Sequence, residues 1–350
     1  MAKESTPSPT LVGDIPIVDF SKFLHGDEEQ KRTVAKQIDR AFRETGFVYL
    51  IGHGIGPDRV SEAFKWSNKF FALPTSIKML APHPPGGSHH RGYSGLGQEK
   101  ISQELYSKSA ISKAREVADV KESFESGNIN DPMQPNLWVP ESHIPGFRGF
   151  MESFFWDCSS LIHTLLSTLS IALDVPTPGL SPTHAQSLFQ LRLLHYPSLP
   201  SRLLRTNAKT RINAHSDFGT LTLLFQDSVG GLEIQDPDPA KKGVWRTVPP
   251  VKDAVLVNVG DLMARWSNGR WRSTMHRVGA PPRQRGGAGG RDEEEEEMCE
   301  PRYSIPFFAT ADMDTVIDAL PGCWDDEHPK LYEPVTAWEY VQMRMAALYE

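Results

Sequence analysis

The sequence predicts a mixed α/β (α+β) fold, in which a largely helical first half packs against a β-barrel core formed by the second half. In the first half, apolar residues recur at helical spacing, and a long apolar stretch follows them. Beyond Ser187, short apolar runs alternate with turn residues, which is typical of a sandwich or barrel. We therefore divide the chain into a flexible tail (1–13), a mostly helical N-terminal region (14–186) and a core region (187–350).

The first elements follow a polar tail that is rich in Pro and Ser. The alternation of apolar and polar residues in IPIVDF (15–20) predicts a short strand, and GFVYLI (46–51) predicts another. Between them we expect a helix over 28–44, which Gly46 is placed to end. Its apolar side chains fall on one face: Val34, Ile38, Ala41 and Phe42.

Two further helices are expected before the core. Pro57 is placed to open one of them, because proline is favoured in the first helical turn. The stretch 81–93 is rich in Pro, Gly and His, which predicts a loop. The other helix covers about 149–173, where His163 interrupts the apolar run, so a buried helix is expected rather than a membrane span.

The second half contains the predicted strands of the core. Asn268-Gly269 is the strongest hairpin signal, lying between MARWS and RWRSTMHRV. Residues 283–300 are Gly-rich and then acidic, without apolar periodicity, and are expected to form a disordered surface loop. The chain then returns to helix in TAWEYVQMRMAALYE. The strand-like runs are LFQLRLLHY, LTLLFQ, GLEIQD, VWRTV, AVLVNV, RWRSTMHRV and RYSIPFF.

Composition narrows the class of protein. The 350 residues carry 37 Lys+Arg against 44 Asp+Glu, a net charge of −7, so no basic face for nucleic acid is expected. Three scattered cysteines fit a reducing compartment, and the polar N-terminus has no apolar signal segment. We expect a cytoplasmic protein without membrane contact. A small-molecule substrate is expected, since no extended recognition element is present, and no feature predicts an oligomeric state.

The chemistry centres on INAHSDFGTLTLLFQD (212–227). In a strand, alternate side chains share a face, so His215 and Asp217 are expected to point together into the barrel. A divalent metal would satisfy both polar groups, and His276, on the predicted returning strand of the hairpin, would supply a third ligand. Two His and one carboxylate are typical of non-haem Fe(II) sites, although an H-x-D alone also fits a hydrogen-bonded core pair.

A second signal lies in RYSIPFF, where Arg302 and Ser304 alternate onto one face. An arginine inside a barrel needs an anion, and a carboxylate is its best partner. A bound dicarboxylate would fit, with Arg302 and Ser304 holding its far end while its near end chelates the metal. An ordinary Arg–Asp core pair is the alternative for Arg302 taken alone.

Taken together, these motifs resemble the iron- and 2-oxoglutarate-dependent dioxygenases of the isopenicillin N synthase-like family. The resemblance covers about 15–348 and includes the first-half motifs IPIVDF, AFRETGFVYLIGHGI, FFALP, RGY and DVKESFESG. In the second half it rests on LRLLHYP, NAHSDFGTLTLLFQD, GGLEIQD, VNVGDLMARWSNGRWRSTMHRV and RYSIPFF. It implies a double-stranded β-helix (jelly-roll) core flanked by helices.

The resemblance also assigns site residues. It implies His215, Asp217 and His276 as the iron ligands, which are also the catalytic centre, and Arg302 with Ser304 as the clamp for the distal carboxylate of 2-oxoglutarate. Tyr196 occupies a position that often contacts the co-substrate, whereas Leu194 stands where the family often has Asn, so one polar contact is missing. Arg192, Tyr93 and Phe308 stand where substrate contacts often lie in the family, and a core or surface role is the alternative for each. His53 in GHGI is expected to be structural.

The reaction implied is oxidation of a small-molecule metabolite by Fe(II), 2-oxoglutarate and O2, with release of succinate and CO2. Hydroxylation, desaturation and ring closure are all open, and ascorbate is expected as a possible stimulant. A 2-oxoglutarate-independent oxidase of the same family is the close alternative; its tripeptide-cyclising members have a C-terminal extension that we do not expect beyond Glu350. A non-catalytic metal-binding member and a zinc hydrolase are the more distant alternatives.

Overall fold

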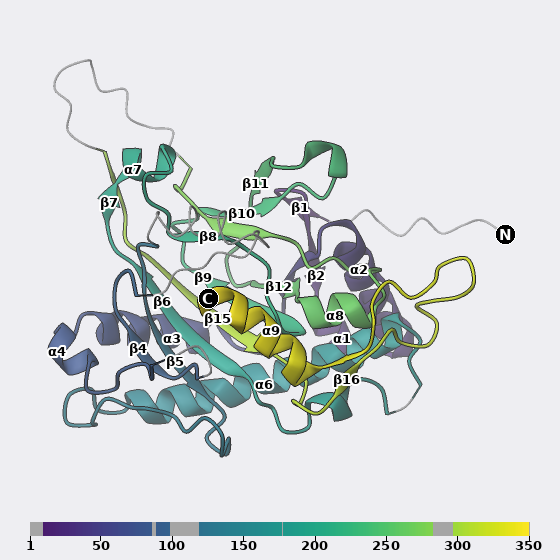
Figure 1. Cartoon of the computed structure of the whole chain (residues 1–350), viewed down its shortest axis with the longest axis horizontal. Helices are drawn as coiled ribbons and strands as arrows, with labels where there is room; N and C mark the ends of the chain where they lie inside the picture. The colour runs from purple at the N-terminus through teal and green to yellow at the C-terminus, as the bar shows by residue number, and fades with distance from the viewer. Residues whose placement is uncertain (1–9, 86–88, 99–118, 177, 283–296, 350) are drawn as a thin grey trace.

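The computed structural model describes residues 10–85, 89–98, 119–176, 178–282 and 297–349 (Figure 1). Within these ranges the chain forms a large sheet and a smaller sheet that face each other, with helices against the outer face of the large sheet. The mixed α/β architecture predicted from the sequence is confirmed. The predicted metal ligands lie between the two sheets, His215 and His276 on the small one and Asp217 bonded to the large one.

The large sheet takes strands from both halves of the chain. Its described strands run in the order β1-β2-β3-β12-β9-β15-β6-β5-β4, and only β2 and β3 pair in parallel. First-half strands therefore form both edges, while second-half strands form the centre. The bounds are β1 Leu11–Val12, β2 Ile15–Asp19, β3 Phe47–Ile51, β4 Gly92–Ser94, β5 Glu122–Gly127, β6 Gln190–Tyr196, β9 Leu221–Gln226, β12 Val255–Val259 and β15 Arg302–Ala309.

The small sheet has the order β11-β10-β13-β8 and consists of second-half strands alone. Apolar side chains from the two sheets meet in one buried cluster, which includes Tyr49, Leu194, Ile212, Ile234 and Val278. The strands are β8 Ile212–His215, β10 Leu232–Gln235, β11 Trp245–Thr247 and β13 His276–Val278. Two further pairs join β7 Leu199–Pro200 to β14 Met298–Cys299 and β16 Val316–Ile317 to β17 Val335–Thr336.

Helices cover the other face of the large sheet, where the long helix α6 runs across it (Figure 1). The ring of Phe154 in α6 lies 5.6 Å from Phe225 of β9, and Phe155 lies 5.2 Å from Phe307 of β15. Burial of these rings is a main source of stability on this side. The helices are α1 Ser21–His25, α2 Glu28–Glu44, α3 Pro57–Phe71, α4 Thr75–Lys78, α6 Phe147–Ala172, α7 Ser201–Arg205, α8 Asp261–Trp266 and α9 Ala337–Tyr349, with 3-10 turns at η1 Ser181–His184 and η2 Pro239–Lys241.

The ends of α2 follow from local sequence. Asp27 accepts a hydrogen bond from the backbone N–H of Gln30, whose side chain accepts one from the backbone N–H of Asp27. This reciprocal pair is a capping box, which satisfies N–H groups that the first turn leaves open. Gly46, with φ +76°, lets the chain turn from α2 into β3 as expected.

Two predicted irregular segments contain short strands. Leu11–Val12 pair with β2, so the predicted tail 1–13 is too long at its end; residues 1–9 lie outside the described residues. Within the predicted loop 283–300, residues 283–296 also lie outside the described residues, but Met298–Cys299 pair with β7. Backbone pairing of this kind needs no apolar periodicity, which is why the sequence pattern missed it.

The predicted hairpin at Asn268-Gly269 is wrong. The segment before it is the helix α8, and Gly269 N–H donates to the carbonyl of Ala264 at 2.8 Å. Asn268 and Gly269 have φ of 50° and 75°, so the pair ends a helix in the left-handed conformation. Asn-Gly favours positive φ in both settings, and the sequence alone does not distinguish them.

Candidate metal centre and carboxylate clamp

Two neighbouring strands of the small sheet bring His215 and His276 together. His215 is the last residue of β8, His276 is the first of β13, and the two are direct partners in the antiparallel register. Their ring centroids are 4.2 Å apart. Strand pairing, rather than the predicted hairpin, therefore places the second histidine beside the first.

Asp217 lies in the loop just beyond β8, not in the strand as the alternation predicted. Its Oδ1 is nevertheless 3.9 Å from Nε2 of His215 and 3.7 Å from Nε2 of His276. Its Oδ2 accepts hydrogen bonds from Thr222 Oγ1 at 2.6 Å and Asn258 Nδ2 at 2.7 Å. One carboxylate oxygen is thus held by the large sheet, and the other faces the imidazoles.

The protonation of these groups suits metal binding. Nδ1 of His215 lies 2.8 Å from the carbonyl of Asn213, and Nδ1 of His276 lies 3.2 Å from that of Thr274. If each Nδ1–H donates to its carbonyl, the Nε2 lone pairs face Asp217. Burial and then the charge of His276 lower the pKa of His215 to about 3, which keeps its ring neutral.

Asp217 is correspondingly held as an anion. Burial alone would raise its pKa, but the two histidines and the hydrogen bonds from Asn258 and Thr222 lower the pKa overall. The ligand atoms of His215, Asp217 and His276 all lie within 4.8 Å of one another. Two imidazoles and one carboxylate match the donor set that holds Fe(II) while leaving coordination positions open.

Arg302 of β15 is a buried cation with neutral partners. Only 1% of the residue is exposed, and its guanidinium donates to Ser304 Oγ and to Gln226 Oε1, each at 3.1 Å. Its Nε has no partner, and no carboxylate of the described residues pairs with it. The predicted alternative of an Arg–Asp core pair is therefore not found in this part of the chain. A buried guanidinium without a counter-ion is costly, so the position fits a bound carboxylate.

A second buried arginine was missed by the sequence reasoning. Arg211 has 0% exposure, and its Nε and Nη1 have no partner among the described residues. Tyr196 lies against both guanidinium groups, with its ring centroid 5.0 Å from Cζ of Arg302 and 5.8 Å from Cζ of Arg211. Burial and then the charge of Arg302 lower the pKa of Arg211. The sequence signal that was available for Arg211 is its position directly before the motif that begins at Ile212 and contains the proposed metal ligands.

Leu194 and Lys121 complete this part of the interior. Leu194 lies opposite Ser304 in the pairing of β6 with β15, so an apolar side chain stands next to the clamp. Lys121, just before β5, is only 2% exposed and is close enough to contribute to the low pKa of His215. The sequence analysis did not single out Lys121, because its exposure depends on the order of strands in the sheet.

Arg192 and Phe308 lie on the face of the large sheet whose Thr222 binds the Asp217 carboxylate. Phe308 of β15 pairs with Thr222 of β9, which holds Asp217. The guanidinium of Arg192 lies over the Phe308 ring, 5.6 Å from its centroid, and forms an ion pair with Glu125 of β5. The structure therefore brings these two predicted substrate residues together beside the metal ligands.

Tyr93 lies on the opposite face. It pairs with Phe124, its ring packs 6.2 Å from Phe70 of α3, and its hydroxyl donates to Glu122 at 2.6 Å. Successive strand residues point to opposite faces, so Tyr93 belongs to the helix-covered side, whereas Gly92 and Ser94 belong to the inner side. The expected substrate contact from Tyr93 is not supported by this placement.

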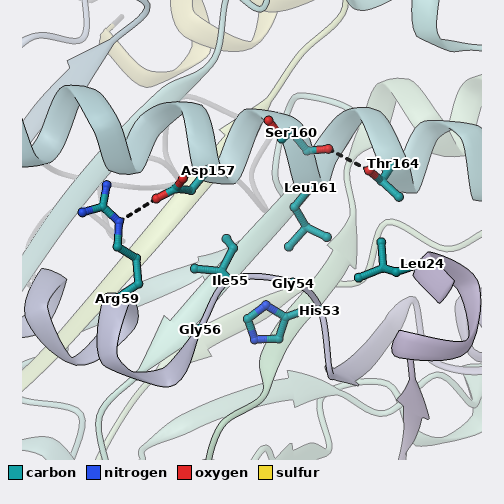
Figure 2. Close-up of a pocket in the computed structure, with 10 residues that line it drawn as sticks. All are labelled: Leu24, His53, Gly54, Ile55, Gly56, Arg59, Asp157, Ser160, Leu161 and Thr164. Carbon is teal, nitrogen blue, oxygen red and sulfur yellow. Dashed lines mark hydrogen bonds and ion pairs between the residues drawn. The ribbon is translucent and has the colours of Figure 1, made fainter.

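A surface cavity also lies on the helix-covered side (Figure 2). It has a volume of about 340 Å³ and is lined by residues of α3, α6 and the loop between β3 and α3, including Arg59, Asp157 and His53. His53 is 6% exposed, and its ring packs against Phe225 at 6.2 Å, in keeping with the structural role expected for it. The cavity holds none of the candidate metal or clamp residues.

Comparison with known proteins covers nearly the whole chain. Residues 15–141 match the family described as "non-haem dioxygenase in morphine synthesis N-terminal", and residues 187–311 match the 2OG-Fe(II) oxygenase superfamily. The chain is 41% identical to the 2-oxoglutarate-dependent dioxygenase frbA of Dothideomycetidae sp., over 96% of this chain and 97% of that protein. It is 37% identical to the proline hydroxylase buaE of Petromyces alliaceus, over 96% and 100%.

Solved structures of similar proteins support the same family assignment. A full-length Neurospora crassa protein, crystallised in complex with alpha-KG, superposes with a TM-score of 0.82 at 36% identity, covering 95% of this chain and 96% of that one. The complex of the same protein with alpha-KG and thymine superposes with a TM-score of 0.81. The predicted jelly-roll core with flanking helices is thereby confirmed. No helix among the described residues is long and apolar enough to cross a membrane. The chain belongs to the Fe(II)- and 2-oxoglutarate-dependent dioxygenases of the isopenicillin N synthase-like superfamily, which use O2 as the oxidant.

Proposed function

We propose that this dioxygenase oxidises a small-molecule metabolite at an iron held by His215, Asp217 and His276. The bound iron and 2-oxoglutarate would supply the oxidation, with O2 consumed and succinate and CO2 released. The chain's own part is to keep the His215 imidazole neutral, the Asp217 carboxylate ionised and water excluded between the sheets. Hydroxylation, desaturation or ring closure of the substrate is compatible with this site, with ascorbate as a stimulant.

The observation that carries the proposal is the buried, carboxylate-free guanidinium of Arg302 on the sheet that also holds Asp217. Arg302 and Ser304 would bind the distal carboxylate of 2-oxoglutarate, because a fork of N–H donors matches a carboxylate. Tyr196 would support the guanidinium with its ring. Arg211, which also lies against Tyr196, adds positive charge that favours an anion here.

The substrate would bind toward Arg192 and Phe308. Phe308 offers an apolar ring, and Arg192 offers a guanidinium already oriented by Glu125. The similar Neurospora crassa protein has been crystallised with thymine and with 5-formyluracil, and buaE is named a proline hydroxylase. Pyrimidines and proline-containing compounds are therefore the first substrates to test.

The test is succinate formation by the purified chain with Fe(II), 2-oxoglutarate, ascorbate and a panel of those compounds. We expect one compound to raise succinate release and O2 uptake together, with one oxidised product per succinate. Phe308→Ala should raise KM for that compound while leaving KM for 2-oxoglutarate nearly unchanged. Product formation without any succinate would instead support the 2-oxoglutarate-independent oxidase, and hydrolysis without O2 use would support a zinc hydrolase.

A further inference from the structure

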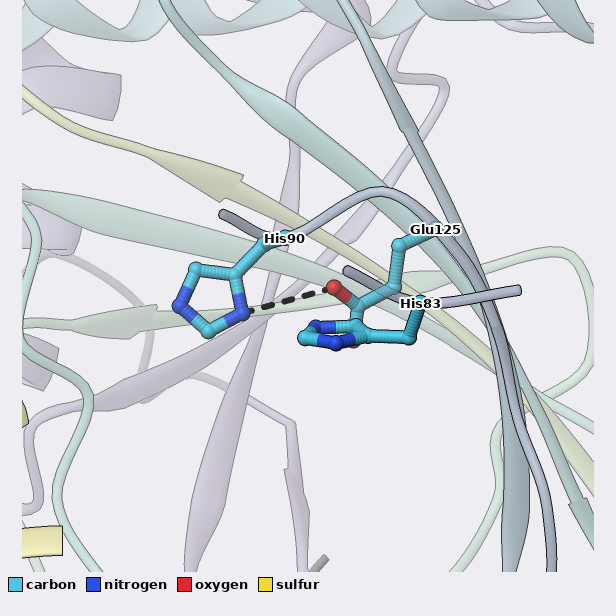
Figure 3. Close-up of side chains that lie close together, drawn as sticks. All are labelled: His83, His90 and Glu125. Carbon is cyan, nitrogen blue, oxygen red and sulfur yellow. Dashed lines mark ion pairs between the residues drawn. The ribbon is translucent and has the colours of Figure 1, made fainter. Parts of the chain in front are cut away.

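We propose that His83, His90 and Glu125 form a second metal site, separate from the iron, which binds a nitrogen-preferring divalent ion such as Zn²⁺. The ligand atoms of the three residues all lie within 4.8 Å of one another, as do those of the iron triad His215, Asp217 and His276. Nδ1 of His90 is 3.4 Å from Glu125 Oε2, and the two imidazole centroids are 6.0 Å apart. Both rings lie next to the Glu125 carboxylate (Figure 3).

The backbone around these residues holds them in place. His83 N–H donates to the carbonyl of Tyr93 at 2.9 Å, which ties it to β4, and β4 pairs with β5, where Glu125 lies. His90 N–H donates to Gln134 Oε1 at 3.1 Å, while its carbonyl accepts from Arg91 Nη1 at 2.8 Å. Ligands fixed in this way lose little freedom when an ion binds.

The orientation of His83 also matches that of a ligand. Its Nδ1 lies 2.7 Å from the carbonyl of Pro84, so Nδ1–H can donate there and leave Nε2 with a lone pair. His215 and His276 have the same arrangement at the iron triad. Glu125 is 0% exposed, whereas both histidines are half-buried, so an ion can reach the site from the side of the imidazoles.

The ligand types and the neighbouring Arg192 together limit which ion can bind. Its guanidinium pairs with Oε1 of Glu125, so the carboxylate would give its other oxygen to the metal. A nearby positive charge weakens binding of any cation. Mg²⁺ and Ca²⁺, which rely on oxygen ligands, should therefore bind poorly, whereas Zn²⁺ gains from two imidazoles.

The site cannot share an ion with the iron triad. Glu125 pairs with Arg192 in β6, β6 pairs with β15, and Phe308 of β15 pairs with Thr222 beside Asp217. Three strand spacings separate Glu125 from Thr222, about 14 Å, whereas ions in a two-metal centre lie about 4 Å apart. Zn²⁺ here would fix the segment carrying His83 and His90 beside the proposed substrate residues.

The experiment is Zn²⁺ titration of the chelator-stripped full chain by calorimetry, with the number of bound ions as the readout. We expect two Zn²⁺ per wild-type chain, since the iron triad also accepts zinc, and one for His90→Ala or His83→Ala. Loss of one imidazole should weaken this second site more than about 100-fold, because even outer-shell changes cost 10- to 100-fold. His89→Ala, which changes a histidine next to the cluster, is the matched control and should keep two. Mg²⁺ should not compete.

His276→Ala separates this site from the proposed function. That variant should retain one Zn²⁺, and His276→Ala combined with His90→Ala should bind none. A wild-type chain with one Zn²⁺, unaffected by His90→Ala and lost in His276→Ala, would overturn the second site and leave the iron site standing. If the iron triad bound no Zn²⁺ but the second site did, the wild type would bind one Zn²⁺ and His90→Ala would bind none. Circular dichroism checks folding, and a glutamine variant at the same position replaces any alanine variant that does not fold.

Discussion

At the scale of single residues, Thr222 and Asn258 determine which oxygen of Asp217 faces the histidines. Both donate to Oδ2, which leaves Oδ1 toward the two imidazoles. The proposed metal ligands follow from an H-x-D pattern and a distant histidine, but these two partners were not predicted from the sequence. Hydrogen bonds between neighbouring strands depend on strand order, which one sequence does not reveal.

Thr222→Val should lower Fe(II) affinity about 10- to 100-fold, because an outer-shell partner that orients a ligand is lost. The measurement is anaerobic Fe(II) titration of the purified variant. Thr220→Val is the matched control, since Thr220 is equally buried but bonds His184 and the carbonyl of Ala309 instead of Asp217. Equal affinity losses in both variants would show that the effect is one of general packing.

His184 should make stability depend on pH. Burial is the main cause that lowers its pKa to about 3, against a usual value of 6.5. A depressed pKa means that the folded state resists protonation of His184. The contribution of neutral His184 to the free energy of unfolding is therefore complete above about pH 6.5 and is lost as the pH falls from there toward 3. The loss is about 1.4 kcal/mol of unfolding free energy per pH unit.

Urea unfolding at pH 7.5 and pH 5.0 tests this. Between the two pH values, the free energy of unfolding of the wild type should fall by about 2 kcal/mol more than that of His184→Gln, because only the wild type has the titrating imidazole. The glutamine can still bond Thr220, which keeps the comparison fair. An identical loss in the two proteins would mean that His184 is not the titrating group.

At the scale of elements, the strands were predicted well and their connections less well. RYSIPFF and LTLLFQ form β15 and β9, as expected for short runs rich in strand-favouring residues. Asn268-Gly269 was misread because the same positive φ that closes a hairpin also ends α8. The sequence did not indicate which sheet face Tyr93 occupies, because the face of an edge strand follows from its register.

Gly219 lies in the loop 216–220, called the metal loop because it carries the proposed ligand Asp217, just before β9. A side chain at this position would not fit. An added Cβ would lie 2.1 Å from the carbonyl oxygen of Ala309 in β15. Gly219→Ala should therefore lower the free energy of unfolding by about 2 kcal/mol or more, as other steric clashes in a core do. It should also weaken Fe(II) binding. Thermal unfolding and iron titration measure the two effects.

Gly149→Ala is the matched control in α6. Nothing lies within 4 Å of its added Cβ, and it sits in the first turn of the helix. This substitution should leave the free energy of unfolding unchanged or raise it by up to about 0.5 kcal/mol, because alanine favours helix over glycine. A destabilised Gly149→Ala, or an unaffected Gly219→Ala, would contradict the packing described for these two elements.

At the scale of the whole molecule, the C-terminal helix reaches the metal loop. Arg344 of α9 forms an ion pair with Asp261 of α8 and donates to Ser216 Oγ at 3.2 Å. Ser216 lies between the two proposed ligands His215 and Asp217. The sequence predicted α9 as a helix but not this contact, since it joins residues more than a hundred positions apart.

Arg344→Ala should therefore weaken Fe(II) binding about 3- to 10-fold, the size expected when one hydrogen bond of about 1 kcal/mol no longer holds a ligand loop. Met343→Ala is the control on the same helix, because Met343 is exposed. Calorimetric iron titration compares the two. Unchanged iron affinity in Arg344→Ala would show that α9 does not support the metal loop.

The most direct test of the proposed iron and 2-oxoglutarate site is anaerobic titration of the wild type and Arg302→Ala with Fe(II) and 2-oxoglutarate, followed by visible absorption. The wild type should develop the weak charge-transfer band of 2-oxoglutarate chelated to iron. In Arg302→Ala, iron should still bind, but the 2-oxoglutarate needed for half of the band should rise about 10- to 100-fold, as for loss of a charged hydrogen bond. Bound iron without a band in the wild type, or the same band at the same 2-oxoglutarate concentration in Arg302→Ala, would contradict the proposed site.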